Sequence, residues 1–535
     1  MISVRRATQL VLLGLFLLLI ILTAFPLPEW LPVQRVFALD PLLFLGPLLS
    51  SGTLVTGLSV LLVLFLATAL LGRFFCGHIC PLGTTLDLSR PLVAGSKRAD
   101  TGPEPGPRTV LGRIKYLLLI LGLAAALLGL NLLHWGSPLS LAARFYALVL
   151  APFFGFVLQL AEAPFGFVSA KAGISSFVPE QVRTYQTLFF LVLFFMALFA
   201  ANRLAPRFWC RYLCPAGAVL GIVGQRPLVR RRVSPACTRC GLCRRRCPMQ
   251  AIPEDPEKTL TSECILCQTC RIVCPEQAVA FSFPAKTSRR EPVHLPGRRA
   301  ALQAVGLGFL LAFVGGAGRS SAGDSHRIRP PGAVPEELFQ TRCLRCGMCQ
   351  TVCPTNMHQP ASLTRGPAGH FTPVDVPRIG PCEPGCNACT RVCPSGAIRI
   401  LDIEEKMWAK MGTAVIDRQA CLAWGYDRSC LVCDEVCPYG AVSLESVEEA
   451  EVFVPFVTES KCSGCGFCEH ACPVQGRAAI RVSNMWEQRL SRGSYIEDGQ
   501  RLGLSISRQG DESAGRKNRE TGKKDDQGLP PGFSD

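Results

Sequence analysis

Cysteine is the residue type most able to do chemistry in this chain, which has 28 cysteines among 535 residues. Twenty-four of them form six quartets, each ending in Cys-Pro. Four quartets share the spacing Cys-x2-Cys-x2-Cys-x3-Cys: Cys237, Cys240, Cys243, Cys247; Cys264, Cys267, Cys270, Cys274; Cys343, Cys346, Cys349, Cys353; and Cys462, Cys465, Cys468, Cys472. Two have a longer first gap: Cys382, Cys386, Cys389, Cys393; and Cys421, Cys430, Cys433, Cys437. At this spacing, three thiolates hold one [4Fe–4S] cluster and the fourth reaches a neighbouring cluster.

Disulfide bonds and zinc sites are the other common uses of clustered cysteines. Disulfides give no reason for repeated copies of one short spacing. Zinc is usually held by two separated Cys-x2-Cys pairs, and not by three neighbouring thiolates with a fourth beyond them. The quartets therefore predict six [4Fe–4S] clusters, paired by exchange of the fourth cysteine.

The remaining cysteines form two Cys-x3-Cys-Pro pairs, Cys76 with Cys80 and Cys210 with Cys214. These four thiols could hold a further cluster or act as a redox pair. The alternative is that they are structural thiols at helix ends, because unreactive cysteine is often buried. No haem is expected: only His78 and His134 precede residue 226, at opposite ends of the predicted spans, and no Cys-x2-Cys-His motif occurs.

The elements that must position these pairs are strongly apolar. Mean hydropathy is +0.28 and 49% of residues are hydrophobic, which favours a membrane protein. We predict four spans, at Ala7–Phe25, Thr53–Gly72, Tyr116–Trp135 and Thr187–Ala205. Residues 1–299 contain 31 Lys and Arg against 13 Asp and Glu, whereas the rest contain 25 against 27. This excess places the N-terminus and both Cys-x3-Cys-Pro pairs on the cytoplasmic side. Because the chain is not uniformly basic and has no basic–aromatic patch outside the membrane-flanking loops, no nucleic-acid partner is expected.

Two further apolar segments allow more than one interpretation. Leu139–Ala161 contains Arg144 and Pro152. A single crossing there would put the two cysteine pairs on opposite sides, so we expect an interfacial or re-entrant helix on the outer face. Arg298 and Arg299 precede a mildly apolar stretch, which is either a twin-arginine-like export signal or a fifth span. Both interpretations place the residues after 320 outside.

The predicted fold is an all-α polytopic membrane domain followed by α+β ferredoxin-like domains that bind [4Fe–4S] clusters. Because such small units bury little apolar core, their folding should depend on cluster binding. The predicted order is a membrane domain (1–225), a cytoplasmic two-cluster domain (226–285), a twin-arginine-like linker with a transmembrane segment (286–320), a periplasmic four-cluster domain (321–490) and a disordered tail (491–535).

Three stretches resemble the NapG/MauM ferredoxin family: Pro381-Cys382-Glu383-Pro384-Gly385-Cys386 with Cys393-Pro394-Ser395-Gly396-Ala397-Ile398, Met411–Asp417 with Cys421–Trp424, and Cys472-Pro473-Val474 with Ala478–Val482. Residues 1–285 resemble the NapH family of polytopic ferredoxins, so the chain is similar to a fusion of the two. The resemblance implies exchange of cysteines between the first and last C-terminal quartets and between the middle two. Sequential pairing is the alternative.

The NapH and NapG resemblance implies electron transfer from membrane quinol to a periplasmic reductase or cytochrome. We predict a quinol dehydrogenase module in a bacterial inner membrane, in contact with lipid and quinol. No nucleotide-binding glycine motif is present. Glu162 is the one carboxylate in the apolar region Leu139–Val168 and is the candidate proton acceptor; the alternative is an interfacial side chain that reaches water. Rival functions are a reductant-supply or maturation factor for a periplasmic metalloenzyme, and a sensor or scaffold with structural clusters.

Overall fold

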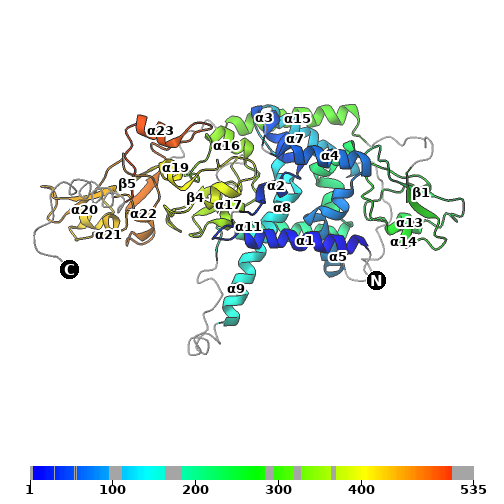
Figure 1. The fold of residues 1–535 in the computed structure, drawn as a ribbon, viewed down its shortest axis with the longest axis horizontal. Helices are drawn as coiled ribbons and strands as arrows, with labels where there is room; N and C mark the ends of the chain where they lie inside the picture. The colour runs from blue at the N-terminus through cyan, green and yellow to red at the C-terminus, as the bar shows by residue number, and fades with distance from the viewer. Residues whose placement is uncertain are drawn as a thin grey trace, which may run out of the picture.

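Helices form the middle of an elongated molecule, and small two-stranded sheets lie toward its two ends (Figure 1). The computed structural model describes residues 4–28, 30–53, 55, 57–94, 111–162, 183–283, 295–317, 327–362 and 369–508. Glu162 ends a described helix, but its side chain lies outside the described part, as do residues 163–168 and the tail from residue 509.

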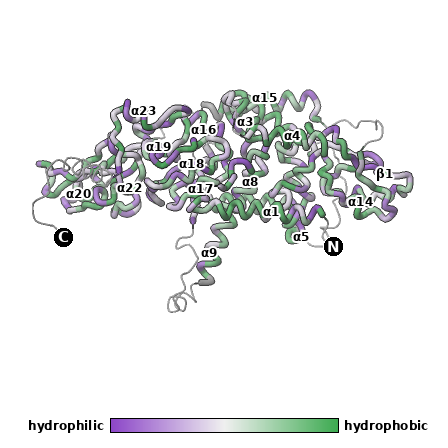
Figure 2. The backbone as a smooth tube through the Cα atoms, viewed as in Figure 1, coloured by the Kyte–Doolittle hydropathy of each residue, from purple (hydrophilic) through white to green (hydrophobic). Residues whose placement is uncertain are grey.

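The helical bundle is built from apolar helices of different lengths. Val4–Leu22 and Pro138–Leu160 are long and apolar enough to cross a membrane, and three shorter helices in the described residues are also apolar. Figure 2 shows the hydrophobic residues along α1 and α9. The bundle helices are α1 Val4–Leu22, α2 Val33–Phe37, α3 Pro41–Ser51, α4 Leu58–Leu71, α5 Pro81–Ala94, α7 Ile114–Leu127, α8 Pro138–Arg144, α9 Ala151–Glu162, α11 Leu188–Leu204, α12 Pro215–Val223 and α15 Arg298–Ala317.

Two parts of the bundle differ from the sequence prediction. The helix expected over Tyr116–Trp135 stops at Leu127, because the chain turns at Gly129 with φ of +84°, a conformation that favours glycine. Helix α3 was not predicted. It begins at Pro41, and the Asp40 side chain caps it by accepting a hydrogen bond from the Leu42 amide at 3.0 Å.

The two ambiguous segments both belong to the helical bundle. Pro138–Glu162 is helical throughout, with a π-helical turn at Phe145–Leu150, and α9 lies crosswise to α1 (Figure 1). Helix α15 packs along α7. A Cβ atom on Gly308 would lie 2.6 Å from the Leu121 carbonyl oxygen, so glycine permits this close approach of two backbones.

Three cluster units lie at the two ends of the bundle, and each is framed by short antiparallel strands. The N-terminal cluster unit (230–283) pairs β1 Arg230–Val233 with β2 Val279–Ser282. The middle cluster unit (328–401) pairs β3 His358–Pro360 with β4 Pro373–Asp375. The C-terminal cluster unit (411–483) pairs β5 Thr413–Ile416 with β8 Ile480–Ser483, and β6 Val442–Glu445 with β7 Val454–Val457.

Short helices lie between and beside these strands, and several of them contain a cysteine. They are α13 Leu242–Arg245, α14 Thr269–Ile272, α16 Glu336–Arg342, α17 Met348–Val352, α18 Ala388–Val392, α19 Ile403–Trp408, α20 Leu422–Tyr426, α21 Val432–Glu435, α22 Phe467–Ala471 and α23 Tyr495–Arg501. The N-terminal cluster unit lies at one end of the molecule, the middle cluster unit lies against the other side of the bundle, and the C-terminal cluster unit lies beyond it (Figure 1).

Candidate metal centres

The N-terminal cluster unit brings its two quartets together by exchange of the fourth cysteine. One cavity of about 360 Å³ is lined by Cys247 with Cys264, Cys267 and Cys270. A second, also of about 360 Å³, is lined by Cys274 with Cys237, Cys240 and Cys243. The pKa of Cys247 is raised to about 11, mainly by burial of its thiol and to a smaller extent by the neighbouring Cys267 thiol. Binding of iron would stabilise the thiolate form that burial disfavours.

The C-terminal quartets pair in sequence order, so the pairing implied by the family resemblance is wrong. Cys393 lines a cavity with Cys343, Cys346 and Cys349, and Cys353 lies within electrostatic range of Cys386 in the second quartet. In the same way, Cys437 lines a cavity with Cys462, Cys465 and Cys468, and Cys472 lines one with Cys421, Cys430 and Cys433. The first quartet therefore exchanges with the second, and the third with the fourth.

Strand pairing explains why neighbouring quartets exchange. Strand β5 precedes the third quartet and β8 follows the fourth, and their antiparallel pairing closes one unit around both. The bridge between Ala333 and Ile398 closes the middle cluster unit around the first two quartets in the same way. The two units meet where the Cys382 amide donates to the Cys465 carbonyl at 2.8 Å, which brings the second and fourth quartets side by side.

One part-buried carboxylate of the middle cluster unit, Glu336, is paired with arginines. Burial alone would raise the pKa of Glu336, but the guanidinium groups of Arg329 and Arg489 hold it well below its usual range. Arg329 Nε donates to Glu336 at 2.9 Å and Arg489 Nη1 donates at 2.6 Å. Arg489 follows β8, so this ion pair also joins the middle cluster unit to the segment that comes directly after the C-terminal cluster unit.

The two Cys-x3-Cys-Pro pairs are built in the same way. Cys76 lies in a π-helical turn, Phe75–Ile79, and Cys210 lies in the equivalent turn, Trp209–Leu213. The second cysteine of each pair precedes the proline that begins α5 or α12. All four thiols are buried and lie within electrostatic range of one another. The structure therefore brings Cys76, Cys80, Cys210 and Cys214 into one place, which we call the four-thiol site.

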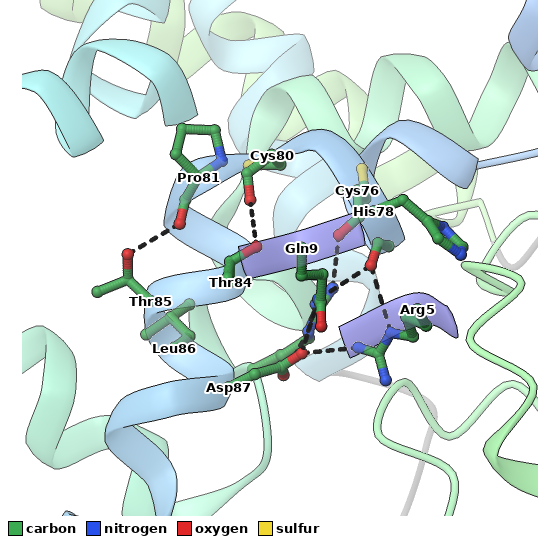
Figure 3. Close-up of polar contacts among 12 residues, drawn as sticks. Arg5, Gln9, Cys76, His78, Cys80, Pro81, Thr84, Thr85, Leu86 and Asp87 are labelled. Atoms are coloured by element: carbon green, nitrogen blue, oxygen red, sulfur yellow. Dashed lines mark hydrogen bonds and ion pairs between the residues drawn. The ribbon is translucent and has the colours of Figure 1, made fainter. Parts of the chain in front are cut away.

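Two buried arginines, Arg207 and Arg73, lie beside the four-thiol site. Arg207 donates to the Cys76 carbonyl at 2.6 Å and to both Asp87 carboxylate oxygens at 2.8 Å. Arg5 shares Asp87, at 2.6 Å. Figure 3 shows Arg5, Gln9 and Asp87 beside Cys76. Gln9 donates to Asp87 at 3.1 Å.

On the other side, Arg73 donates to the Ser262 carbonyl at 3.1 Å and to Glu263 at 2.9 Å. Lys115 donates to the same Glu263 oxygen at 2.5 Å. Arg73 and Arg207 were not predicted as site residues. A sequence motif could have indicated them, because each stands three residues before the first cysteine of its pair, in Arg-Phe-x-Cys.

The four-thiol site contacts the N-terminal cluster unit directly. A Cβ atom on Gly77 would lie only 2.2 Å from the Ile265 carbonyl oxygen. Ile265 stands between Cys264 and Cys267 in the sequence. The cysteine group Cys247, Cys264, Cys267 and Cys270 is therefore the one beside the bundle. The other cysteine group of this unit contains Cys240, the one exposed cysteine, and is the outer one.

The opposite end of the bundle contacts the middle cluster unit through hydrogen bonds, with no ion pair between the described residues of the two parts. Asn131 Nδ2 donates to the Thr341 carbonyl at 2.7 Å, and Ser140 Oγ donates to the Leu344 carbonyl at 2.8 Å. The buried ring of His134 lies 3.1 Å from the Cys343 carbonyl. The histidine thus contacts a cysteine backbone. His78 makes a local contact with the Phe74 carbonyl at 3.2 Å.

A short path connects the four-thiol site with this second end. A Cβ atom on Gly136 would lie 2.7 Å from the Pro215 ring. Pro215 follows Cys214, and Gly136 lies two residues after His134. The cysteine groups therefore form one series, from the N-terminal cluster unit through the four-thiol site to the middle and C-terminal cluster units.

Comparisons with known proteins agree with this series of cysteine sites. A family model described as a 4Fe-4S binding domain matches residues 53–98 and 187–235, which contain the two Cys-x3-Cys-Pro pairs. Other 4Fe-4S binding models match residues 237–251, 261–277 and 340–356. A 4Fe-4S dicluster model matches 382–441 and 428–476. The second range covers quartets that the structure pairs, whereas the first covers quartets that it does not pair.

Characterised relatives are ferredoxin-type proteins. The chain is 38% identical over 160 residues to the methylamine utilization ferredoxin-type protein MauM of Methylophilus methylotrophus, covering 29% of this chain and 70% of the relative. It is 36% identical over 165 residues to the ferredoxin-type protein NapG of Escherichia coli, with coverages of 29% and 70%. For MauM of Paracoccus denitrificans, identity is 37% over 205 residues, with coverages of 37% and 89%. These findings confirm the predicted resemblance to NapG and MauM, and the chain belongs to this family of iron–sulfur electron-transfer proteins.

Proposed function

We propose that this chain is a membrane-bound electron relay that oxidises quinol and passes single electrons to a redox protein on the outer side, a periplasmic reductase or cytochrome. The observation that carries the proposal is the unbroken series of cysteine sites from one end of the helical bundle to the other. Iron–sulfur clusters accept and release one electron at a time. Centres on both sides of the bundle are what a relay through it requires.

The membrane arrangement is part of the same proposal. Helices α1, α4, α7 and α11 would cross the bilayer, with the N-terminal cluster unit in the cytoplasm and the other two units outside, as in a fusion of NapH-like and NapG-like proteins. The close packing of α15 on α7 supports a fifth span over a cleaved export signal. Exposed apolar side chains on α1, such as Val11 at 61% and Leu15 at 56% exposure, suit contact with lipid.

The crosswise helix α9 is the proposed quinol-facing element. Its exposed side chains include Phe153, Phe154 and Leu160, and a helix with such a surface suits the interface of a bilayer. Glu162 ends this helix. In the proposal, its carboxylate takes a proton from quinol.

The alternative function is supply of reductant to a periplasmic metalloenzyme during maturation. It uses the same clusters but requires no quinol oxidation at turnover rates. A fusion of alkaline phosphatase after Ser321 tests the orientation: the proposal requires periplasmic phosphatase activity, and activity only for a cytoplasmic reporter at that position would overturn it.

The direct test is to add a reduced menaquinol analogue, without oxygen, to the purified cluster-loaded protein. Reduction is followed by EPR and by bleaching of the thiolate-to-iron absorption. We expect rapid reduction of a subset of clusters, blocked by a quinol-site inhibitor and slowed in Glu162→Gln at unchanged iron content. No reduction by quinol, together with full reduction by dithionite, would contradict quinol oxidation and favour the reductant-supply function.

A further inference from the structure

The four-thiol site has a charge pattern that its own side chains do not balance. It contains two triads, each with two cations around one carboxylate. Arg207 and Arg5 share Asp87 at 2.8 and 2.6 Å, and Arg73 and Lys115 share Glu263 at 2.9 and 2.5 Å. Each triad therefore leaves one positive charge unpaired.

Most of these cations have no access to solvent. The side chains of Arg73 and Lys115 are 0% exposed and that of Arg207 is 1% exposed. Buried charges without a partner cost several kcal/mol each, so the surplus needs a buried anion nearby. Neutral thiols at Cys76, Cys80, Cys210 and Cys214 would not supply it.

The hydrogen-bonding groups of Arg73 also point to a missing partner. Its Nε and Nη2 atoms are buried and have no hydrogen-bond acceptor. Nη2 lies against Gly217, 2.8 Å from where a Cβ atom would stand. The Gly217 amide donates to Cys214 Sγ at 3.3 Å. The unpartnered Nη2 group of Arg73 therefore lies beside the residue that bonds to a thiol of the site.

We propose that the four-thiol site holds a single iron–sulfur cluster shared by both Cys-x3-Cys-Pro pairs, with two ligands from each and with Arg73 and Arg207 as its counter-charges. Four thiolates around a dicationic cluster core leave a dianion, which balances one surplus positive charge from each triad. The cluster would supply one-electron storage inside the bundle. This inference rests on the proposed relay, in which the site would link the N-terminal and middle cluster units.

The side chains of this chain fit such a group in three ways. The repeated π-helical turns present Cys76 and Cys210, and the residues before Pro81 and Pro215 present the other two thiols. Arg207 fixes the first turn by its bond to the Cys76 carbonyl at 2.6 Å. The positive charges favour the more negative, reduced state of a cluster, so they raise its reduction potential.

The first test counts clusters in the full-length protein, loaded anaerobically. The wild type should contain the iron and sulfide of one cluster more than the six quartets require. Cys76→Ser and Cys210→Ser should each lose that same amount and the same EPR component. Iron equal to six clusters in the wild type, or unchanged EPR spectra in both variants, would overturn the proposal. The count does not involve quinol, so it stands if quinol oxidation fails.

The second test measures the role of the arginine with a matched pair of variants. In Arg207→Gln, one counter-charge is lost, so a redox titration should show one cluster at a more negative midpoint potential. Arg207→Lys should restore most of the potential because the charge remains. If Arg207→Gln retains the full iron content and every midpoint potential is unchanged, the arginine is not a counter-charge of a cluster.

Discussion

The two ends of the helical bundle hold their cluster units by different chemistry. At the N-terminal cluster unit the contact is ionic: Arg73 and Lys115 from the bundle share Glu263. At the middle cluster unit no ion pair joins the described residues of the two parts: Asn131 and Ser140 donate to the backbone carbonyls of Thr341 and Leu344, and the Arg345 guanidinium donates to the Asn131 carbonyl at 3.4 Å.

The difference between the ends follows from what lies behind each contact. Glu263 belongs to a charge network that surrounds the four-thiol site, so the ionic contact couples the docking of one cluster unit to the charge of that site. Hydrogen bonds at the other end fix the position of the middle cluster unit without a carboxylate that the two parts share. We therefore expect the ionic end to be the more sensitive to single substitutions.

Removal of the shared carboxylate should have the largest effect. Glu263→Gln leaves Arg73 and Lys115 buried without their anion, and loss of one partner of a buried ion pair costs about 3–5 kcal/mol. The N-terminal cluster unit should then become protease-sensitive and melt at lower temperature. Glu257→Gln is the matched control, because the Arg239–Glu257 pair is 71% and 53% exposed and such pairs contribute about 0–1 kcal/mol. Equal effects of the two substitutions would refute the buried ionic contact.

Glu336 allows a pH test of the stability of the middle cluster unit. Its pKa is held below the usual range by Arg329 and Arg489, so its stabilising contribution is present above the unfolded pKa of about 4.3 and is lost as pH falls through the folded value. Glu336→Gln should lower stability at pH 7 by about 2–4 kcal/mol and reduce the further loss on acidification. Thermal bleaching of the clusters from pH 7 to 3 measures this, with Glu404→Gln as an exposed control. An unchanged pH profile would show that Glu336 is not paired in solution.

A single methyl group can test the contact between the four-thiol site and the N-terminal cluster unit. In Gly77→Ala, the new Cβ atom would lie 2.2 Å from the Ile265 carbonyl, and overpacking of this kind costs about 1–3 kcal/mol. Hydrogen exchange at residues 260–270 should increase. Gly14→Ala is the control, because nothing lies within 4 Å of its Cβ position. Identical exchange in wild type and Gly77→Ala would mean that the two parts are not in contact.

The end without an ion pair should respond least. Asn131→Ala removes the hydrogen bond to the Thr341 carbonyl at 2.7 Å and leaves a buried acceptor, at a cost of about 1–3 kcal/mol. We expect a small decrease in melting temperature without any change in iron content. A loss larger than that of Glu263→Gln would reverse the proposed difference between the ends.

Local spacing was enough to group the cysteines into quartets, but contacts distant in sequence decided how the quartets combine. Each quartet could be read from neighbouring cysteines. Exchange in sequence order depends on the pairing of β5 with β8, two strands of four residues whose own pattern is too short to specify a partner. The arginine triads were missed for the same reason, since Arg73 and Glu263 lie far apart in the sequence.

The helices were predicted where apolar runs were continuous and were mispredicted where one residue ends a run. Val4–Leu22 and Leu188–Leu204 agree with the predicted spans within a few residues. The expected span at Tyr116–Trp135 ends early because Gly129 adopts a positive φ. The short apolar segment at Pro41–Ser51 is shorter than a membrane span, so hydropathy alone did not indicate it.

Electron transfer through the bundle is the central claim, and sealed vesicles test it most directly. The full-length, cluster-loaded protein is placed in vesicles that contain an oxidised cytochrome, and dithionite is added outside. The relay predicts reduction of the enclosed cytochrome at a rate that falls to that of protein-free vesicles in Cys76→Ser. An enclosed cytochrome that stays oxidised while the outward-facing clusters are fully reduced would contradict the relay.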